Sequence, residues 1–294
     1  MIKPPPLAKG AKIGIVALAG SMDSEIVLQG EDFLEDLGYD VLTAPSCFEK
    51  NRYFAGNSEK DRALDLKMMF AEDEVGAILN MRGGYGSNRL MPYIKDFNFA
   101  RYPKPFIGYS DITYMHIYLN QHQNLVTYHG PMIKDLLKND PSTIDNFIYS
   151  CLDGVPLTLR NVGYFTEQNH QVKGLTVGGN LTIVASTLGT EYEIDTRGKI
   201  LFLEEVNEEP YVVDRLLMQL LFAKKIQDCA GLILGSFSGQ DKVGIMETIK
   251  DILLSTKKVI AYNIPAGHTS PNISIPLGVM CTLDVAKKQI IFED

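Results

Sequence analysis

A serine stands where a short apolar segment of the chain becomes polar. Residues 105–113 (PFIGYSDIT) pass from a β-rich run through Gly108 to a helical stretch that begins at Asp111. In such a strand–turn–helix elbow, the serine at the tip projects its hydroxyl above the sheet, and N–H groups of the helix start face a developing oxyanion. Taken alone, the pattern fits a helix-capping Ser110 better, because Ile112 replaces the second glycine of GxSxG. Ser110 is therefore a candidate nucleophile that needs further support.

A serine hydroxyl becomes a useful nucleophile only beside a base, and histidine is the usual one. The chain has five histidines: His116, His122, His129, His170 and His268. His116 and His122 belong to the elbow's own helix and point away from its tip, His170 lies in a polar segment, and His129 follows a strand. His268 lies in the Gly- and Pro-rich loop 264–272, which is stiff enough to hold an imidazole in place. It is the preferred base, although a surface turn histidine is the commoner explanation of such a residue.

A carboxylate could orient that imidazole and stabilise its cation. Glu204 stands where the apolar run 201–203 ends, and Glu205 follows it directly. Successive side chains of a strand point to opposite faces, so only one of the two glutamates can face a site. A pair of solvated glutamates explains the pattern equally well.

Two glycine-rich segments could bring the backbone close to a ligand. Residues 82–87 (RGGYGS) follow an apolar strand, and we assign them to oxyanion and substrate contacts, an ordinary flexible loop being the alternative. Residues 178–180 form a comparable turn that helix capping explains. Neither GxGxxG nor GxxxxGK is present, and HExxH is absent. The sequence therefore predicts a reaction without cofactor or metal.

The elements that must position these residues alternate along the first half of the chain. Apolar β-rich runs are separated by segments of helical period, which is typical of a parallel sheet covered by helices. The predicted strands are 12–17, 40–43, 75–80, 105–108 and 125–128, and the predicted helices include 24–37, 58–70 and 142–152. In a doubly wound α/β domain of this kind, ligands bind beyond the carboxyl ends of the strands. The loops at 20–21, 82–87 and 109–111 should then share one rim.

The second half predicts a smaller α/β domain. It begins with 171–177 and a helix after the turn 178–180. The expected strands that follow are 199–203, 231–234 and 259–262, and the expected helix is 211–223. A hairpin of 279–283 with 289–292 is expected to close the domain. The polar segment 153–171 shows no sustained period. We therefore predict an N-terminal domain at 1–152, a linker at 153–171 and a C-terminal domain at 172–294.

Composition narrows the class of protein. A net charge of −8 on 294 residues, without long runs of one sign, argues against nucleic acid as a partner. No apolar run is long enough to cross a membrane, and the N-terminus has no signal-peptide core, so we expect a soluble cytoplasmic protein. The cysteines Cys47, Cys151, Cys229 and Cys281 are far apart and are expected to be reduced core thiols.

Taken together and in order, the motifs resemble the LD-carboxypeptidases (muramoyltetrapeptide carboxypeptidases), a family that includes microcin C self-immunity peptidases. The resemblance covers nearly the whole chain and rests on 80–86 (NMRGGYG), 107–111 (IGYSD), 178–181 (GGNL), 203–205 (LEE) with Tyr211, Asp214 and Arg215, and 265–268 (PAGH). It implies a flavodoxin-like N-terminal domain that carries the serine, and a C-terminal domain that supplies glutamate and histidine. The family's catalytic residues fall on Ser110, Glu204 and His268, in that chain order.

The same resemblance implies a serine carboxypeptidase of peptidoglycan recycling. Ser110, deprotonated by His268, would attack the carbonyl that joins an L-centred diamino acid to the terminal D-alanine of a murein tetrapeptide. Backbone N–H groups of Gly84 and Asp111 would form the oxyanion hole, and Arg82 and Tyr85 would contact the substrate. Family members are commonly homodimers, so a homodimer is expected.

Two rival functions remain at this point. A microcin-immunity-like peptidase would cut a peptidyl-nucleotide amide with the same machinery. It would favour an aromatic stacking surface, which Tyr164 and Phe165 could supply in a chain without tryptophan. A non-catalytic binding protein with a two-domain cleft is the other rival, and an intact triad disfavours it.

Overall fold

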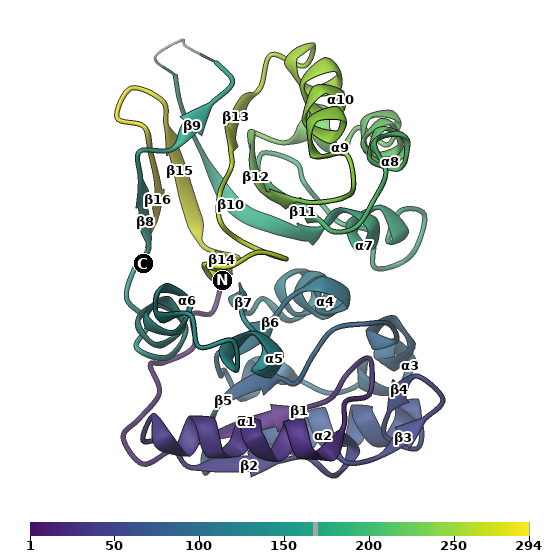
Figure 1. Ribbon diagram of the computed structural model, residues 1–294, viewed down its shortest axis with the longest axis vertical. Coiled ribbons are helices and arrows are strands. Elements are labelled where there is room, and N and C mark those ends of the chain that lie inside the picture. The colour runs from purple at the N-terminus through teal and green to yellow at the C-terminus, as the bar shows by residue number, and fades with distance from the viewer. Residues whose placement is uncertain (167–169, 294) are drawn as a thin grey trace. The chain divides into compact units, whose positions relative to one another are not determined.

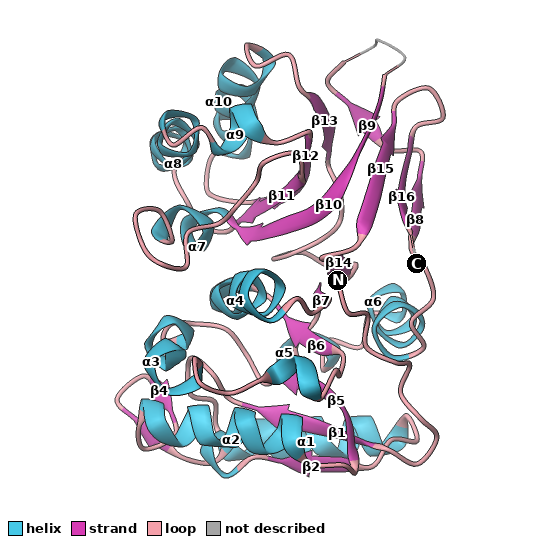
Figure 2. Ribbon diagram, turned by 180° about the vertical axis from the view of Figure 1, so that it is seen from behind, coloured by secondary structure: helices cyan, strands magenta, loops and turns pink. Residues whose placement is uncertain are grey.

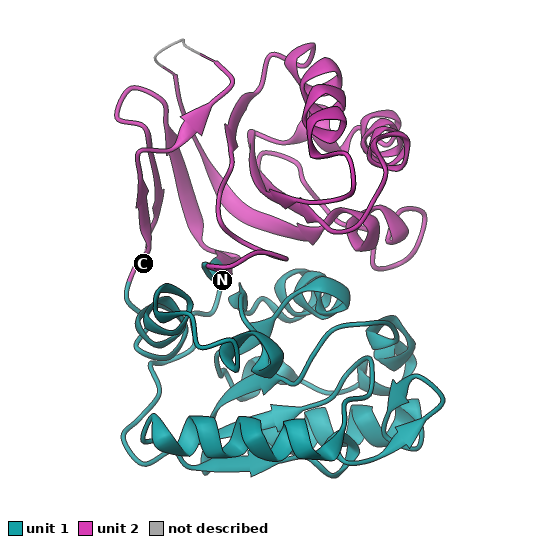
Figure 3. Cartoon of the chain, viewed as in Figure 1, with its two compact units in different colours: residues 1–155, 273–275 teal, residues 156–272, 276–294 magenta. Residues whose placement is uncertain are grey.

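The computed structural model describes residues 1–166 and 170–293. Within them the chain forms two compact units, shown in Figure 3. Unit 1 comprises Met1–Val155 and Ile273–Ile275, and unit 2 comprises Pro156–Asn272 and Pro276–Asp294. None of the helices in the described part of the chain has the length and apolar character needed to span a membrane.

Unit 1 is built on a parallel sheet (Figure 1). Its strands are β1 (Lys12–Val16), β2 (Val41–Thr43), β5 (Val75–Asn80), β6 (Phe106–Gly108) and β7 (Thr127–His129). They lie in the order β2-β1-β5-β6-β7 with every pairing between them parallel, and β14 (Ile275–Leu277) follows β7 at the edge. Ile13, Ile78 and Ile107 are fully buried, as expected for strands covered on both faces. The five strands predicted for this half each lie within two residues of an observed one.

Helices of unit 1 pack against this sheet, and a small hairpin lies beside it. The helices are α1 (Ser24–Asp36), α2 (Glu59–Ala71), α3 (Met91–Ile94), α4 (Thr113–Gln123), α5 (Ile133–Leu136) and α6 (Pro141–Asn146), and the hairpin consists of β3 (Lys50–Asn51) and β4 (Phe54–Ala55). Ser58 caps α2 by accepting a hydrogen bond from the Asp61 N–H. The predicted helix 142–152 is α6 followed by a π-helical segment, Phe147–Leu152.

Unit 2 contains a mixed sheet with helices packed beside it (Figure 2). In sheet order its strands are β8 (Thr158–Arg160), β16 (Gln289–Phe292), β15 (Met280–Asp284), β10 (Gln171–Asn180), β11 (Ile200–Glu205), β12 (Gly231–Phe237), β13 (Val259–Tyr262) and β9 (Gly163–Tyr164). The run from β10 to β13 is parallel and the remaining pairings are antiparallel. The helices are α7 (Leu181–Ser186), α8 (Pro210–Phe222), α9 (Lys225–Asp228) and α10 (Lys242–Leu254).

Two features of unit 2 differ from the sequence prediction. Strands β8 and β9 lie inside the segment 153–171 predicted as a linker, of which 167–169 fall outside the described residues. Both strands are short and are edge strands of the sheet, so they lack the apolar run that marks a buried strand. The segment 178–180, predicted as a turn, is the end of β10, with Gly178 and Gly179 at φ of 129° and 145°.

The four cysteines are free and buried. Burial raises the pKa of each thiol, that of Cys229 to about 11, so the thiolate form is disfavoured. The prediction that the four cysteines lie in the core is confirmed.

Candidate active site

Ser110 lies at a strained turn between β6 and α4. Its φ of 65° is in the left-handed region, which costs a residue with a side chain about 1–3 kcal/mol. A 3-10 turn, Ser110–Ile112, leads into α4, and the N-cap position is taken by Tyr109 without a side-chain capping bond. Ser110 is therefore not a helix cap, which removes the alternative explanation for this serine. A strained backbone at such a turn is one feature of a nucleophile elbow.

The glycine-rich loop packs directly against this elbow. A Cβ placed on Gly83 would lie 2.9 Å from Ser110 Cβ and 3.0 Å from its Oγ, so only glycine allows this approach. The Gly20 N–H donates to the Gly83 carbonyl at 3.1 Å, and the Ser87 N–H donates to Asp111 Oδ2 at 2.8 Å. The three loops predicted to share one rim of the sheet are thus hydrogen-bonded or packed together.

Asp111 uses its side chain to hold that loop. The residue is 3% exposed, and its carbonyl oxygen also accepts a hydrogen bond from the Ser87 hydroxyl at 2.6 Å. Burial raises the pKa of the Asp111 carboxyl, and the hydrogen bonds from Ser87 act in the opposite direction. The carboxylate is therefore engaged in structure, which leaves the backbone N–H as the part of Asp111 that could serve an oxyanion.

A cavity of about 610 Å³ in unit 1, here called the Gly84 cavity, adjoins the glycine loop. Its lining residues are Gly20, Ser21, Met22, Asp23, Ile26, Lys50, Arg52, Tyr53, Arg82, Gly84, Tyr85 and Lys134. Four of these are basic and one is acidic. Arg82 Nη1 donates to the Ser21 carbonyl at 3.1 Å, while its Nε is buried without a partner among the described residues. The lining of the cavity therefore has a net positive charge, which suits an anionic ligand.

Glu204 and His268 form a bonded pair in unit 2. Glu204 is the penultimate residue of β11 and is fully buried, and its Oε2 lies 2.8 Å from His268 Nδ1. The same oxygen accepts the His268 backbone N–H at 3.2 Å, whereas Oε1 has no partner in the described part of the chain. The imidazole is 21% exposed. A carboxylate at Nδ1 fixes the tautomer that makes Nε2 the basic nitrogen.

Glycines make room for this pair. A Cβ on Gly267 would collide with the Glu204 carboxylate, and Gly267 adopts a φ of 96°. The Gly267 N–H donates to Asn272 Oδ1 at 2.9 Å. This hydrogen bond joins the two ends of the segment 267–272, which contains His268. A Cβ on Gly235 would lie 3.1 Å from Glu204 Cβ. The Glu204 side chain therefore occupies space that a side chain at position 235 or 267 would otherwise fill.

Comparison with known proteins shows the family of the chain. The LD-carboxypeptidase N-terminal domain matches residues 13–130, and the LD-carboxypeptidase C-terminal domain matches residues 173–283. The chain belongs to the LD-carboxypeptidase family. Of the predicted site residues, unit 1 contains Ser110, Gly84, Asp111, Arg82 and Tyr85, and unit 2 contains Glu204 and His268.

Individual relatives resemble the chain over nearly its whole length. The probable murein peptide carboxypeptidase of Bacillus subtilis (strain 168) is 35% identical over an alignment of 309 residues, which covers 99% of this chain and 94% of the relative. A solved muramoyltetrapeptide carboxypeptidase from Oxalobacter formigenes is 26% identical with a TM-score of 0.87, covering 97% of this chain and 99% of that one. A solved MccF-like protein from Bacillus anthracis str. Ames is 26% identical with a TM-score of 0.89, covering 99% of each chain.

Glu205 has a structural role that sequence reasoning missed. It is 3% exposed and does not face solvent, which contradicts the alternative of two solvated glutamates. It accepts hydrogen bonds from Asn180 Nδ2 at 2.9 Å and from the Thr182 N–H and hydroxyl at 2.8 and 2.7 Å. Asn180 in turn caps α7. The strand alternation that separates Glu204 from Glu205 was the signal for two different roles.

His116, another histidine of unit 1, supports the fold. His116 is fully buried, with Nε2 2.8 Å from the Gly108 carbonyl and Nδ1 2.9 Å from Thr127 Oγ1. Burial lowers the pKa of His116 to about 4. A neutral imidazole thus supports the strand that ends at the elbow. In residues 1–166 and 170–293, no group of three or more His, Cys, Asp or Glu side chains could hold a metal ion.

Proposed function

We propose that the protein is a serine carboxypeptidase that releases the terminal D-alanine from murein tetrapeptides, with Ser110, Glu204 and His268 as its triad. The observation that carries this proposal is the hydrogen bond of 2.8 Å between the fully buried Glu204 carboxylate and His268 Nδ1. A buried carboxylate that orients a partly exposed imidazole is the arrangement that activates a serine. The strained, uncapped Ser110 elbow supplies the matching hydroxyl.

The proposed reaction is an acyl transfer in two stages. His268 Nε2 takes the proton of the Ser110 hydroxyl while Ser110 Oγ bonds to the carbonyl carbon of the scissile amide. Backbone N–H groups of Gly84 and Asp111 would stabilise the resulting oxyanion. The C–N bond then breaks as His268 returns the proton to the D-alanine amine, which leaves an ester on Ser110. Water, deprotonated by His268, hydrolyses the ester, and Glu204 stabilises the imidazolium in both stages.

The Gly84 cavity supports a substrate rich in carboxylates. Murein tetrapeptides have several such groups, and the basic side chains of the cavity are Lys50, Arg52, Arg82 and Lys134. Arg82 lines the cavity and would bind the terminal carboxylate. Tyr85 is 46% exposed, and its ring lies 6.3 Å from that of Tyr53, so the two rings would contact the peptide stem.

The second candidate function is hydrolysis of a peptidyl-nucleotide amide, as in microcin self-immunity. The similarity to an MccF-like protein favours it, and so does an aromatic pair in unit 2. Phe165 stacks on Tyr262 with ring centroids 4.4 Å apart, while the Tyr164 hydroxyl is occupied by a hydrogen bond to the Gln289 carbonyl. Tyr164 and Phe165 both remain proposed members of such a stacking surface.

One experiment separates these functions. The full-length protein is incubated in parallel with a murein tetrapeptide and with an aspartyl-nucleotide sulfamate, and the products are identified by mass spectrometry. The proposal expects free D-alanine and a tripeptide from the first and slower or no cleavage of the second. Preferential cleavage of the nucleotide substrate would replace the first candidate with the second, and cleavage of neither would favour a binding protein.

The proposal also covers the fold class of the N-terminal domain, the location of the protein and its oligomeric state. The strand order β2-β1-β5-β6-β7 corresponds to 2-1-3-4-5 and supports a flavodoxin-like class for the N-terminal domain. The four free, buried thiols support a cytoplasmic location, where thiols remain reduced. We also propose a homodimer, which light scattering of the purified protein would test.

A further inference from the structure

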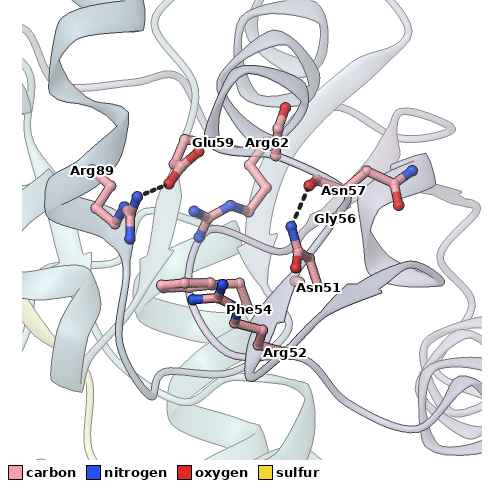
Figure 4. Close-up of a pocket in the computed structure, with 10 residues that line it drawn as sticks. Asn51, Arg52, Phe54, Gly56, Asn57, Glu59, Arg62 and Arg89 are labelled. Carbon is pink, nitrogen blue, oxygen red and sulfur yellow. Dashed lines mark hydrogen bonds and ion pairs between the residues drawn. The ribbon is translucent and has the colours of Figure 1, made fainter.

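A second cavity in unit 1, here called the Arg62 cavity, lies between the β3–β4 hairpin and the start of α2 (Figure 4). Its volume is about 260 Å³, which suits a small ligand. Its lining residues are Asn51, Arg52, Phe54, Ala55, Gly56, Asn57, Ser58, Glu59, Arg62 and Arg89. Of these only Arg52 also lines the Gly84 cavity. The proposed peptidase reaction uses none of the residues that are confined to the Arg62 cavity.

Arg62 places a buried positive charge in this cavity. Its side chain is 1% exposed, and its Nη1 donates to the carbonyls of Leu18 at 2.8 Å and Ala19 at 3.3 Å. Its Nε is buried without a hydrogen-bond partner in the described residues, and no carboxylate among them is bonded to the guanidinium. Burial lowers the pKa of Arg62, while the nearby Glu59 and Asp111 carboxylates act in the opposite direction. A bound anion would offset the cost of burying this charge.

A second guanidinium lies beside it. Arg62 and Arg89 both lie over the Phe54 ring, with their Cζ atoms 5.2 and 5.1 Å from the ring centroid. Figure 4 shows the two guanidinium groups turned toward the same space above Phe54, with Glu59 paired to Arg89. Three arginines and one glutamate line the cavity, so its formal charge is positive.

The start of α2 also lies at this cavity, with the carboxylates of Glu59 and Asp61 in its first turn. The helix has 13 residues, and both its N-cap, Ser58, and its first residue, Glu59, line the cavity. The N-terminus of a helix carries a partial positive charge and backbone N–H groups that favour phosphate and other oxyanions. The Ser58 hydroxyl is already used within the cap, since it accepts from the Asp61 N–H.

We propose that the Arg62 cavity binds a phosphate group, either as inorganic phosphate or on a small phosphate monoester. Two guanidinium groups and a helix N-terminus match a compact dianion with several acceptor oxygens better than they match a monoanionic carboxylate. The site is independent of the proposed peptidase function, because its test measures binding. It adjoins the glycine loop, since a Cβ on Gly86 would lie 2.9 Å from Arg62 Nη1 and 2.8 Å from the Phe54 ring.

The test is a calorimetric titration of inorganic phosphate into the full-length protein at constant ionic strength in chloride. Wild type should bind in a saturable manner. Arg89→Gln should weaken binding about ten-fold or more, since a charge-assisted hydrogen bond is lost. Arg89 is half exposed, so this variant should fold. Glu59→Gln should tighten binding a few-fold, because it removes a carboxylate that repels phosphate and competes for Arg89.

The matched control is Arg101→Gln, which removes an exposed arginine of unit 1 that lines neither cavity. It should bind phosphate as wild type does. Glycerol 3-phosphate in place of phosphate distinguishes a monoester from the free ion, and binding of either supports the site. The proposal is overturned if neither binds, if Arg101→Gln weakens binding as much as Arg89→Gln, if Glu59→Gln fails to tighten it, or if acetate binds as well as phosphate.

Discussion

Ser110 in unit 1 and His268 in unit 2 are positioned by different physical means. Ser110 is held through its backbone, with a left-handed φ of 65° and Gly83 packed against its side chain. His268 is held through its side chain, by a bond of 2.8 Å to a carboxylate that is fully buried. The difference indicates that the serine side chain can be removed at little cost to the fold, whereas the histidine depends on a buried charged partner.

The largest expected effect is that of Ser110→Ala. This variant should lower the rate of D-alanine release from a murein tetrapeptide by roughly a thousand-fold or more, because no other hydroxyl would replace the nucleophile. The backbone that shapes the elbow is unchanged, so the urea-unfolding midpoint should remain that of wild type. Ser142→Ala, at an exposed serine of the same unit, is the control. Near-normal turnover by Ser110→Ala would refute its role.

The second effect compares two neighbouring carboxylates. Glu204→Gln should lower kcat about a hundred- to ten-thousand-fold, since the imidazole loses the partner that sets its tautomer and stabilises its cation. Glu205→Gln should instead lower the free energy of unfolding by about 1–3 kcal/mol, because Glu205 accepts bonds from Asn180 and Thr182. Steady-state kinetics and urea unfolding of both variants measure this. Equal kinetic losses would mean that the two glutamates do not differ in role.

A smaller effect concerns the support beneath the elbow. Burial lowers the pKa of His116 from 6.5 to about 4, so between these values the unfolded chain binds a proton that the folded chain does not. This contribution to stability is complete above about pH 6.5 and is lost as the pH falls toward 4. It should amount to about 2 kcal/mol between about pH 7 and pH 5.

Urea unfolding at the two pH values gives the measurement for His116. His116→Asn should show a shallower loss of stability with acid than wild type does. His122→Gln, at an exposed histidine of the same helix, should retain the wild-type slope. If His116→Asn keeps the full slope, this histidine is not the group that titrates.

The smallest expected effect is that of a chelator. The proposed reaction uses a hydroxyl, an imidazole and a carboxylate, so EDTA should leave the rate of D-alanine release unchanged. An assay with and without EDTA, followed by added zinc, provides the check. Activity that is lost with EDTA and restored by zinc would show that Ser110 and His268 are not sufficient for the chemistry.

Local sequence signals were strongest where an element is regular and buried. The predicted strands 75–80, 259–262 and 289–292 coincide with β5, β13 and β16. Short apolar runs bounded by polar residues are typical of strands in a sheet. Edge strands β8 and β9 were missed because they carry no such run. Helix α10 (Lys242–Leu254) was also not predicted.

The sequence by itself determined the family, the order of the elements and the candidate residues Ser110, Glu204 and His268, because these depend on residue types and spacing. Only the tertiary structure decided that Ser110 has a strained φ instead of capping its helix, and that Glu204 and Glu205 are buried in separate hydrogen-bond networks. It also brought Arg62, Arg89 and Phe54 together around one cavity. Burial, backbone strain and charge compensation arise from contacts between segments distant in sequence, and a local pattern does not contain them.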